Sequence, residues 1–406
     1  MAIKLVDVHN RDQGKFQEGK FDTLPIAGST LISTIDIDLQ TYGEQLMQNK
    51  IGAIVAIEPS TGEILSLVSA PTYNPNLLIG RKRSDNYKIL SEDENKPLFN
   101  RALQGTYPPG STFKLINGLI ALQEKIVTKN KLFGCDGDNG YSYGRDRHVG
   151  CHPHQNPIEL EKGVEISCNA YFCPLYDSYF NQFESTISAY DNWHNHVASF
   201  GIGNYMNNDF TTGSPGKLPK SSYFEKLYRG SWNANTIISM AIGQGELLLT
   251  PIQMANMTAI IANRGFYYTP HIIKEISGQE SIDTNFTKKK YCSIEQKHFT
   301  PIINGMQKVI EGKDGTAQNS KIPDLEICGK TGTAQNPHGE DHSIFIAFAP
   351  KDNPKIAIAV YVENGGFGST WAAPIASLMI DKYLNKSINN TNLEEFILNG
   401  NLISEK

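Results

Sequence analysis

The feature that most constrains folding is the break at Pro108-Pro109-Gly110, directly before an apolar segment from Ser111 to Gln123. Prolines lack a backbone donor and glycine adopts conformations closed to other residues, so no regular element runs through this point. The segment that follows is rich in Leu, Ile and Ala and predicts a largely buried helix. Ser111 then stands at the helix start, where free N–H groups and the helix dipole favour a developing negative charge.

Apolar runs near both ends of the chain predict strands, and the region between them predicts mostly helices. A turn rich in Pro and Gly at 58–63 joins two of the runs as a hairpin, which implies an antiparallel sheet. The expected strands are 30–35, 51–57, 64–68, 343–348 and 356–362. The expected helices are 36–47, 111–123, 157–180, 250–263 and 371–384.

Length and charge narrow the class of protein. A chain of 406 residues accommodates one large domain with smaller attachments. The 37 basic and 42 acidic residues give a net charge of −5 without a long basic run, so nucleic acid is not an expected partner. No stretch approaches the roughly 18 to 20 apolar residues that span a bilayer. We therefore expect any membrane anchor to lie outside this sequence, with 10–19 as a connector.

The first chemical pattern is Ser111-Thr112-Phe113-Lys114. Residues three apart on a helix share a face, so the Lys114 amine can lie beside the Ser111 hydroxyl. A serine needs a base to become a nucleophile, and a lysine is a base only when burial or nearby positive charge lowers its pKa. The alternative interpretation is an N-cap serine followed by a solvated lysine.

The second pattern is Ser-x-Asn, for which we select Ser167-Cys168-Asn169. Ser167 could relay a proton between Lys114 and a leaving amine, while Asn169 could orient Lys114 and the substrate backbone. Cys168 is expected to be a small packing residue. The pattern is weak alone, since it also begins at Ser84, Ser231 and Ser387.

The third pattern, Lys330-Thr331-Gly332-Thr333, lies in a segment that resembles a strand. Gly332 would let a ligand backbone approach closely. Lys330 supplies a positive charge suited to a substrate carboxylate. The competing interpretation is an edge strand with an exposed lysine.

In this order, the three patterns resemble the signature of penicillin-binding proteins and serine β-lactamases. Their surroundings resemble most closely the class B penicillin-binding proteins, in particular the penicillin-binding protein 2 group of cell elongation. The stretches that carry this resemblance are Asp36 to Gln40, Tyr107 to Gly110, Ile242 to Glu246, Lys330 to Asn336 and Val362 to Gly366. The resemblance implies a two-lobed α/β (α+β) fold, with a five-stranded antiparallel sheet flanked by helices next to an all-helical lobe.

The resemblance also implies a peptidoglycan D,D-transpeptidase. Ser111 would attack a D-Ala-D-Ala stem peptide to form an acyl-enzyme, which an amine on a neighbouring stem would then resolve. Backbone N–H groups of Ser111 and Thr333 would form the oxyanion hole, and Lys330, Thr331 and Thr333 would hold the substrate carboxylate. β-Lactams would acylate the same serine, and the chemistry would need no cofactor.

Two other functions share the acylation step. A serine β-lactamase would hydrolyse its acyl-enzyme, and a β-lactam sensor would be acylated without forming cross-links.

For a transpeptidase we expect a location on the outer face of the bacterial cytoplasmic membrane, in the periplasm, and partners that include a membrane glycan polymerase and elongation-complex proteins. The expected domains are 1–29 as linker or pedestal remnant, 30–385 as transpeptidase domain and 386–406 as C-terminal tail.

A loop before Ser167 gathers possible metal ligands. Cys135 and Cys151 are followed by His154, and zinc accepts such nitrogen and sulfur ligands. The alternatives are a Cys135–Cys151 disulfide or two unpaired thiols. The sequence therefore offers a structural zinc site as a hypothesis.

Overall fold

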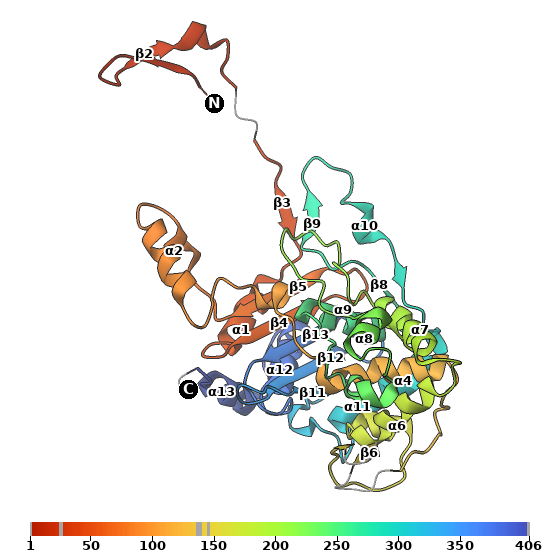
Figure 1. Cartoon of the computed structure of the whole chain (residues 1–406). Coiled ribbons are helices and arrows are strands. Elements are labelled where there is room, and N and C mark those ends of the chain that lie inside the picture. The colour runs from red at the N-terminus through yellow and green to blue at the C-terminus, as the bar shows by residue number, and fades with distance from the viewer. Residues whose placement is uncertain (1, 24–26, 135–139, 144–146, 404–406) are drawn as a thin grey trace.

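The computed structural model of the protein describes residues 2–23, 27–134, 140–143 and 147–403. Its centre is one antiparallel sheet in the spatial order β11-β12-β13-β4-β5 (Figure 1). These strands are β4 (Gly52–Ile57), β5 (Ile64–Ala70), β11 (Cys328–Ala334), β12 (His342–Ala349) and β13 (Ile356–Val362). The sheet thus joins the two ends of the chain, and the expected five-stranded antiparallel sheet is confirmed.

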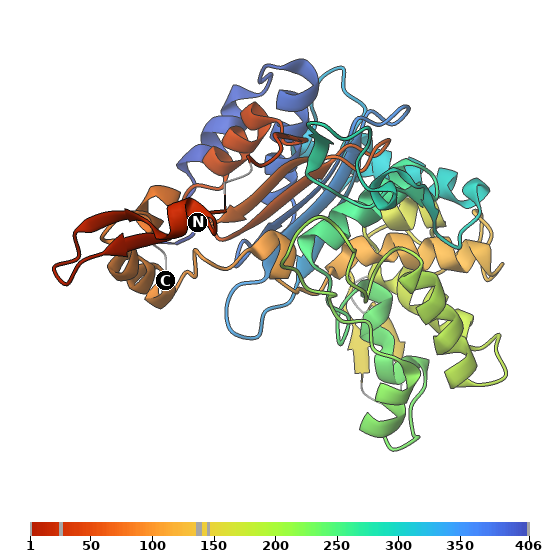
Figure 2. The same ribbon diagram turned by 90° about the horizontal axis from the view of Figure 1, so that it is seen from above.

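Both faces of the sheet are buried. Along β4, Ile54 and Ala56 pack on one side, while Ala53, Val55 and Ile57 pack on the other. Successive side chains of a strand alternate between faces, so a run without polar residues requires cover on both. Figure 2 shows the sheet between two groups of helices.

The first face is covered by α1 (Ile37–Leu46) and α12 (Ala372–Asn385). The second is covered by α9 (Pro251–Ala262), in which every residue is buried. Most residues of α9 are apolar, as expected of a helix in the interior, and it packs against β4, β12 and β13. Thr250 begins this helix through a reciprocal capping pair with Gln253.

A helical lobe lies beside the sheet, as the sequence predicted. Its helices are α4 (Lys114–Gln123), α5 (Leu160–Glu165), α6 (Asn169–Phe180), α7 (Thr186–Ala198), α8 (Ser221–Leu227) and α11 (Phe299–Glu311). The continuous helical stretch predicted over 157–180 is wrong, because it divides into α5 and α6. The break falls at Ser167, whose φ of 57° is left-handed and cannot continue a right-handed helix.

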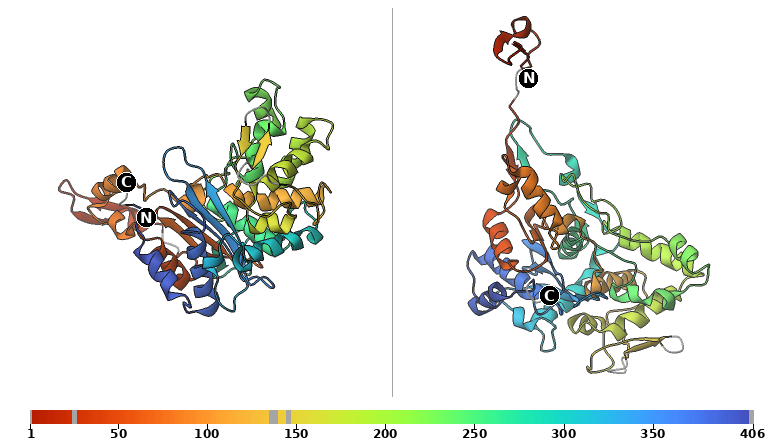
Figure 3. Two further views of the ribbon diagram at one scale, coloured as in Figure 1. Left: turned by 90° about the horizontal axis from the view of Figure 1, so that it is seen from below. Right: turned by 60° about the vertical axis from the view of Figure 1, so that its left-hand side comes forward.

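The remaining elements lie around this core. The N-terminal hairpin of β1 (Lys4–Val6) and β2 (Asp12–Lys15) stands apart from the body (Figure 3). The strand predicted at 30–35 forms β3 (Leu31–Ser33), which pairs with β9 (Ile273–Ile276) outside the main sheet. Shorter elements are α2 (Arg83–Glu92), α3 (Arg101–Gln104), β6 (Tyr141–Tyr143), β7 (Arg147–Val149), β8 (Phe266–Tyr267), α10 (Thr284–Thr287), β10 (Lys290–Tyr291) and α13 (Thr391–Asn399).

Among the described residues, no helix combines the length and the apolar character needed to cross a bilayer.

Asn117 fixes α4 against its neighbours from inside the helical lobe. Its Nδ2 donates to the carbonyls of Met240 and Ala241 at 3.1 and 3.0 Å. Its Oδ1 accepts from Trp193 Nε1 at 2.9 Å. A buried amide with three partners locates α4 relative to α7 and to the 3₁₀ helix η5 (Ala234–Ile242).

We predict that Asn117→Leu lowers the free energy of unfolding by about 3 kcal/mol, because it leaves buried polar groups without partners. Urea unfolding followed by fluorescence measures the change. The same substitution at Asn195, which is exposed on α7, is the matched control and should change stability little. Equal effects of the two substitutions would contradict the role given to Asn117.

Candidate active site

Ser111 lies at the start of the buried helix, as predicted. A short 3₁₀ turn, η3 (Gly110–Phe113), leads directly into α4. Ser111 lines a pocket of about 430 Å³ between the sheet and the helical lobe. Ser167, Asn169, Thr331 and Thr333 line the same pocket. The structure therefore brings the three sequence patterns together around one space.

Two glycines allow the nucleophile to approach the edge of the sheet. Gly110 has φ of 56°, and its N–H donates to the Gly243 carbonyl at 2.9 Å. A Cβ on Gly110 would lie 2.7 Å from the Thr333 carbonyl oxygen, and one on Gly243 would lie 2.1 Å from the Gly110 oxygen. Neither side chain could be accommodated, so the conformation that places Ser111 beside β11 depends on both glycines.

Tyr107 anchors the segment before the turn. Its hydroxyl donates to Glu363 at 2.8 Å, and Arg101 Nε forms an ion pair with the same Glu363 oxygen at 2.9 Å. Tyr107 also stacks on Tyr361 with ring centroids 4.0 Å apart. Glu363 follows β13 directly, so these contacts fix the Pro-Pro-Gly turn to the central sheet.

Lys114 is fully buried and bonds to the Ser-x-Asn turn. Its Nζ lies 2.7 Å from the Ser167 carbonyl, 3.2 Å from Ser167 Oγ and 2.6 Å from Asn169 Oδ1. Burial lowers the pKa of Lys114 to about 8. None of the hydrogen bonds in the described part of the chain joins Lys114 to Ser111, although both side chains belong to the same short helical segment.

The left-handed turn at Ser167 presents both polar members of its pattern to the site. Asn169 begins α6, and its Nδ2 donates to the Gly150 carbonyl at 2.8 Å. Its amide is therefore held from both ends, by Gly150 and by Lys114. This contact also ties the loop before α5 to the site.

Lys330 is not the solvent-exposed cation that would be expected on an edge strand. It is fully buried, and its Nζ donates to the Thr331 carbonyl at 3.0 Å. Burial, followed by the charge of Lys114, holds the pKa of Lys330 well below its usual range. Thr331 and Thr333 of β11 line the pocket, whereas Lys330 is not among the residues that line it.

Other pocket residues were not selected from the sequence as site residues. Thr316 Oγ1 lies 2.7 Å from Thr331 Oγ1, and Gln244 Nε2 donates to the Thr333 carbonyl at 3.0 Å. His152, Asp341 and Phe367 also line the pocket. One signal could have located Thr316: the pentapeptide Gly-Thr-Ala-Gln-Asn occurs at 315–319 and again at 332–336. Each copy supplies a threonine to the same pocket.

A group of sulfur and imidazole atoms lies directly behind the Ser-x-Asn turn. Cys151 Sγ is 3.6 Å from Cys168 Sγ and 3.7 Å from His154 Nε2, and His154 Nε2 is 3.1 Å from Cys168 Sγ. Cys168 is buried in the core, as expected of a packing residue, and its thiol is also a member of this cluster. Cys135, the other candidate ligand, lies outside the described residues.

The protonation of the cluster follows from its contacts. His154 Nδ1 lies 2.9 Å from the Gln155 carbonyl, which can only accept, so Nδ1 carries the hydrogen and Nε2 presents a lone pair to the sulfurs. Hydrogen bonds from the Cys168 thiol and from the backbone N–H groups of Ala170 and Asn169 lower the pKa of Cys151. Ligands about 2.0 to 2.3 Å from a tetrahedral zinc ion lie roughly 3.5 to 3.8 Å apart, close to the observed spacing.

Comparison with known proteins now identifies the family. The model of the penicillin binding protein transpeptidase domain matches residues 52–381. Peptidoglycan D,D-transpeptidase MrdA of Haemophilus influenzae is 31% identical to this chain, covering 95% of it and 61% of the relative. MrdA of Acinetobacter baumannii is 32% identical, covering 89% of this chain and 54% of the relative. The chain therefore spans less than two thirds of the length of either relative.

Solved structures give the same result. Pseudomonas aeruginosa PBP2 in complex with WCK 5153 superposes with a TM-score of 0.79 and 34% identity, covering 94% of this chain and 87% of that one. Penicillin-binding protein A of Mycobacterium tuberculosis, as a ceftriaxone acyl-enzyme, gives a TM-score of 0.73 and 27% identity, covering 88% and 81%. The chain belongs to the penicillin-binding protein transpeptidase domain family.

Proposed function

We propose that this chain is a peptidoglycan D,D-transpeptidase domain that becomes acylated on Ser111. The observation that carries the proposal is the environment of Lys114. A buried amine with a lowered pKa, held by Ser167 and Asn169 beside the pocket of Ser111, is a base that can function near neutral pH. We infer that residues 30–385 form this domain.

In the acylation step, Ser111 Oγ bonds to the carbonyl carbon of the penultimate D-Ala as its proton passes to Lys114 Nζ. The oxyanion of the tetrahedral intermediate accepts hydrogen bonds from the Ser111 and Thr333 N–H groups. The C–N bond then breaks. Ser167 relays the proton from Lys114 to the departing D-Ala amine, which leaves an ester on Ser111.

In the second step, an amine of a neighbouring stem attacks the ester carbonyl. Its proton returns to Ser111 Oγ through Lys114, and the cross-linked peptide leaves. During the first step, before the terminal D-Ala leaves, its carboxylate binds Thr331 and Thr333, next to Lys330. Thr316 supports this subsite through its hydrogen bond with Thr331.

Partners and location follow the relatives. Solved neighbours include PBP2 with MreC from Helicobacter pylori, at 25% identity and a TM-score of 0.76, and a peptidoglycan synthase complex, at 27% and 0.78. We propose partners of the same kind for this protein: a membrane glycan polymerase, elongation-complex proteins, peptidoglycan stem peptides and β-lactams. We place it on the outer face of the bacterial cytoplasmic membrane, with an N-terminal anchor outside this sequence.

We also propose that Cys151, His154 and Cys168 hold a structural zinc ion, with Cys135 as a candidate fourth ligand. The donor set, the tautomer of His154 and the spacing of the three atoms support the proposal. Bound zinc would fix the loop at Gly150 against the Ser167 turn and thereby stabilise Asn169. The transpeptidase reaction itself requires no cofactor.

Benzylpenicillin tests the acylation step and separates the three functions that share it. We predict a stable adduct of one drug molecule by intact-mass spectrometry, absent in Ser111→Ala. Rapid loss of the adduct with hydrolysis of free drug would indicate a β-lactamase instead. A stable adduct without amide formation, when a D-alanyl thioester donor and a D-amino-acid acceptor are supplied, would indicate a sensor. The absence of any adduct would refute the assignment of Ser111.

The pH dependence tests Lys114 as the base. Because burial lowers its pKa to about 8, the neutral fraction and the acylation rate should rise roughly tenfold between pH 7 and 9 and then level off. Lys114→Arg retains the charge but not the base and should slow acylation at least about a hundredfold. Stopped-flow measurement of drug binding gives both rates. A rate that is flat across this range would exclude Lys114 as the titrating base.

Metal analysis tests the zinc proposal. Protein purified without chelators should contain about one zinc per chain, and Cys151→Ser or Cys168→Ser should lose most of it. Cys292→Ser is the matched control, since Cys292 is also buried but lies apart from the cluster. Zinc-free wild-type protein, or equal zinc in all variants, would refute the site.

A further inference from the structure

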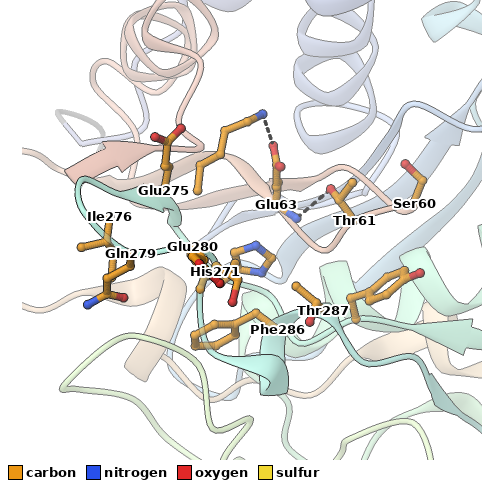
Figure 4. A pocket seen from close by; sticks show the side chains of 14 residues that line it. Ser60, Thr61, Glu63, His271, Glu275, Ile276, Gln279, Glu280, Phe286 and Thr287 are labelled. Carbon is orange, nitrogen blue, oxygen red and sulfur yellow. Dashed lines mark hydrogen bonds and ion pairs between the residues drawn. The ribbon is translucent and has the colours of Figure 1, made fainter. Parts of the chain in front are cut away.

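The central sheet has a pocket at each of its ends. One, of about 610 Å³, lies at the turn between β4 and β5 (Figure 4). The pocket that contains Ser111 lies at the other end, where Gly52 of β4 aligns with Val362 of β13 and, through β12, with Thr333. There the chain leaves β13 into a loop, residues 363–371, that leads to α12. The contacts that hold this loop therefore bear on the Ser111 pocket.

The loop between β13 and α12 forms one wall of that pocket. Phe367, Gly368 and Ser369 line it. Gly368 packs directly on β11 and β12, because a Cβ there would lie 2.5 Å from the Gly332 carbonyl oxygen and 2.3 Å from that of Ile344. Gly332 separates the two threonines proposed to bind the substrate carboxylate. A displacement of the loop would thus alter the place where that carboxylate binds.

Trp371 ends the loop and lies between two glycines. A Cβ on Gly365, within the loop, would lie 3.2 Å from Cδ1 of the indole. A Cβ on Gly400, directly after α13, would lie 2.2 Å from Cζ3, well inside van der Waals contact. Phe396 of α13 stacks on the same indole, with ring centroids 5.1 Å apart and planes inclined by 17°. The indole therefore connects α13 to the loop at the active site.

A buried lysine fixes the end of α13. Lys50 Nζ donates to the carbonyls of Ile397 and Gly400 at 2.7 and 3.1 Å. These bonds satisfy carbonyls that the end of a helix leaves without a partner. The Leu402 N–H also donates to the Asn49 carbonyl at 2.9 Å. Because Lys50 lies just before β4, the contacts attach α13 to the end of the sheet that carries the Ser111 pocket.

We propose that Trp371 is a positioning residue for the active site and that α13 holds it in place. Packed between Gly365 and Gly400, the indole keeps the loop against β11. Trp371 is not among the residues that line the Ser111 pocket, so it acts through the loop and not by touching substrate. The effect on substrate binding rests on the function proposed for Ser111, whereas the connection between α13 and the loop does not.

Gly400→Ala and Asn399→Ala are a matched pair of variants. The φ of Gly400 is −70°, which alanine can adopt, but the added methyl group collides with the Trp371 ring. Asn399 is exposed at the end of α13, so its truncation leaves the indole untouched. The two variants thus differ in whether they displace Trp371.

Hydrogen–deuterium exchange measured by mass spectrometry follows the loop without any assay of activity. In the structure the Gly366 N–H donates to the Asp341 carbonyl at 2.7 Å, which protects it from exchange. We expect peptides that cover the loop to exchange at least about tenfold faster in Gly400→Ala than in Asn399→Ala. Peptides from β12 and β13 should exchange alike in both variants, which verifies that the sheet is folded.

Acylation kinetics test the effect on the site. Because the loop lines the pocket but Lys114 governs proton transfer, Gly400→Ala should raise the dissociation constant of the noncovalent benzylpenicillin complex at least about fivefold. The limiting rate and its pH dependence should change less than about twofold. Trp371→Phe, which keeps a ring between the two glycines, should bind the drug more tightly than Trp371→Leu.

Two results would overturn the proposal. Equal exchange of the loop in Gly400→Ala and Asn399→Ala would show that α13 does not hold it, whatever the activity. Faster exchange in Gly400→Ala without a change in drug binding would show that the held loop does not position the site. If the wild-type protein is not acylated at all, the function proposed for Ser111 fails, and the exchange experiment alone decides whether α13 holds the loop.

Discussion

A lysine amine buried without a carboxylate partner governs the layout of the active site. In the described residues, the ion pairs do not include Lys114, and its Nζ forms hydrogen bonds with oxygens of Ser167 and Asn169 and lies 5.8 Å from the centroid of the Phe172 ring. An ammonium in this setting is costly, so the pKa falls and the neutral amine becomes accessible. The amine then has two hydrogens and one lone pair. The short contacts to the Ser167 carbonyl and Asn169 Oδ1 use the hydrogens, and the lone pair is free to take a proton from a hydroxyl.

The conformation of the backbone around Lys114 makes these contacts possible. The left-handed Ser167 turns its carbonyl and its hydroxyl toward the same amine, which a continuous helix could not do. Gly110 and Gly243 let the turn that bears Ser111 contact β11, so the two proposed oxyanion donors, the N–H groups of Ser111 and Thr333, come from separate parts of the chain. Tyr107 and Glu363 then fix this turn to β13. The geometry therefore depends on contacts between the two ends of the chain as much as on the helix that bears Ser111.

Much of this was predictable from the sequence, and the misses have physical causes. The apolar runs at 51–57 and 356–362 predicted strands because their burial leaves no polar residue. Their membership of one five-stranded sheet was implied only by the resemblance, and their order in it was not predicted, since strand pairing over 300 residues leaves no local trace. The break at Ser167 was missed because a non-glycine left-handed residue gives no warning. The contacts of Cys168 with Cys151 and His154 were not predicted, because they depend on how the loop folds back. Thr316 was overlooked although it stands in a repeated pentapeptide.

The two buried lysines are linked by charge. The positive charge of Lys114 contributes to lowering the pKa of Lys330, and such an interaction acts equally in both directions. A substrate carboxylate at Thr331 and Thr333 stabilises the protonated form of Lys330 below it. A protonated Lys330 in turn disfavours protonation of Lys114. In the proposed mechanism, the carboxylate and the protonated Lys330 act on Lys114 with opposite signs, so the bound carboxylate does not raise the pKa of the proposed base. A second buried lysine can in this way keep the base neutral while the site holds an anionic substrate.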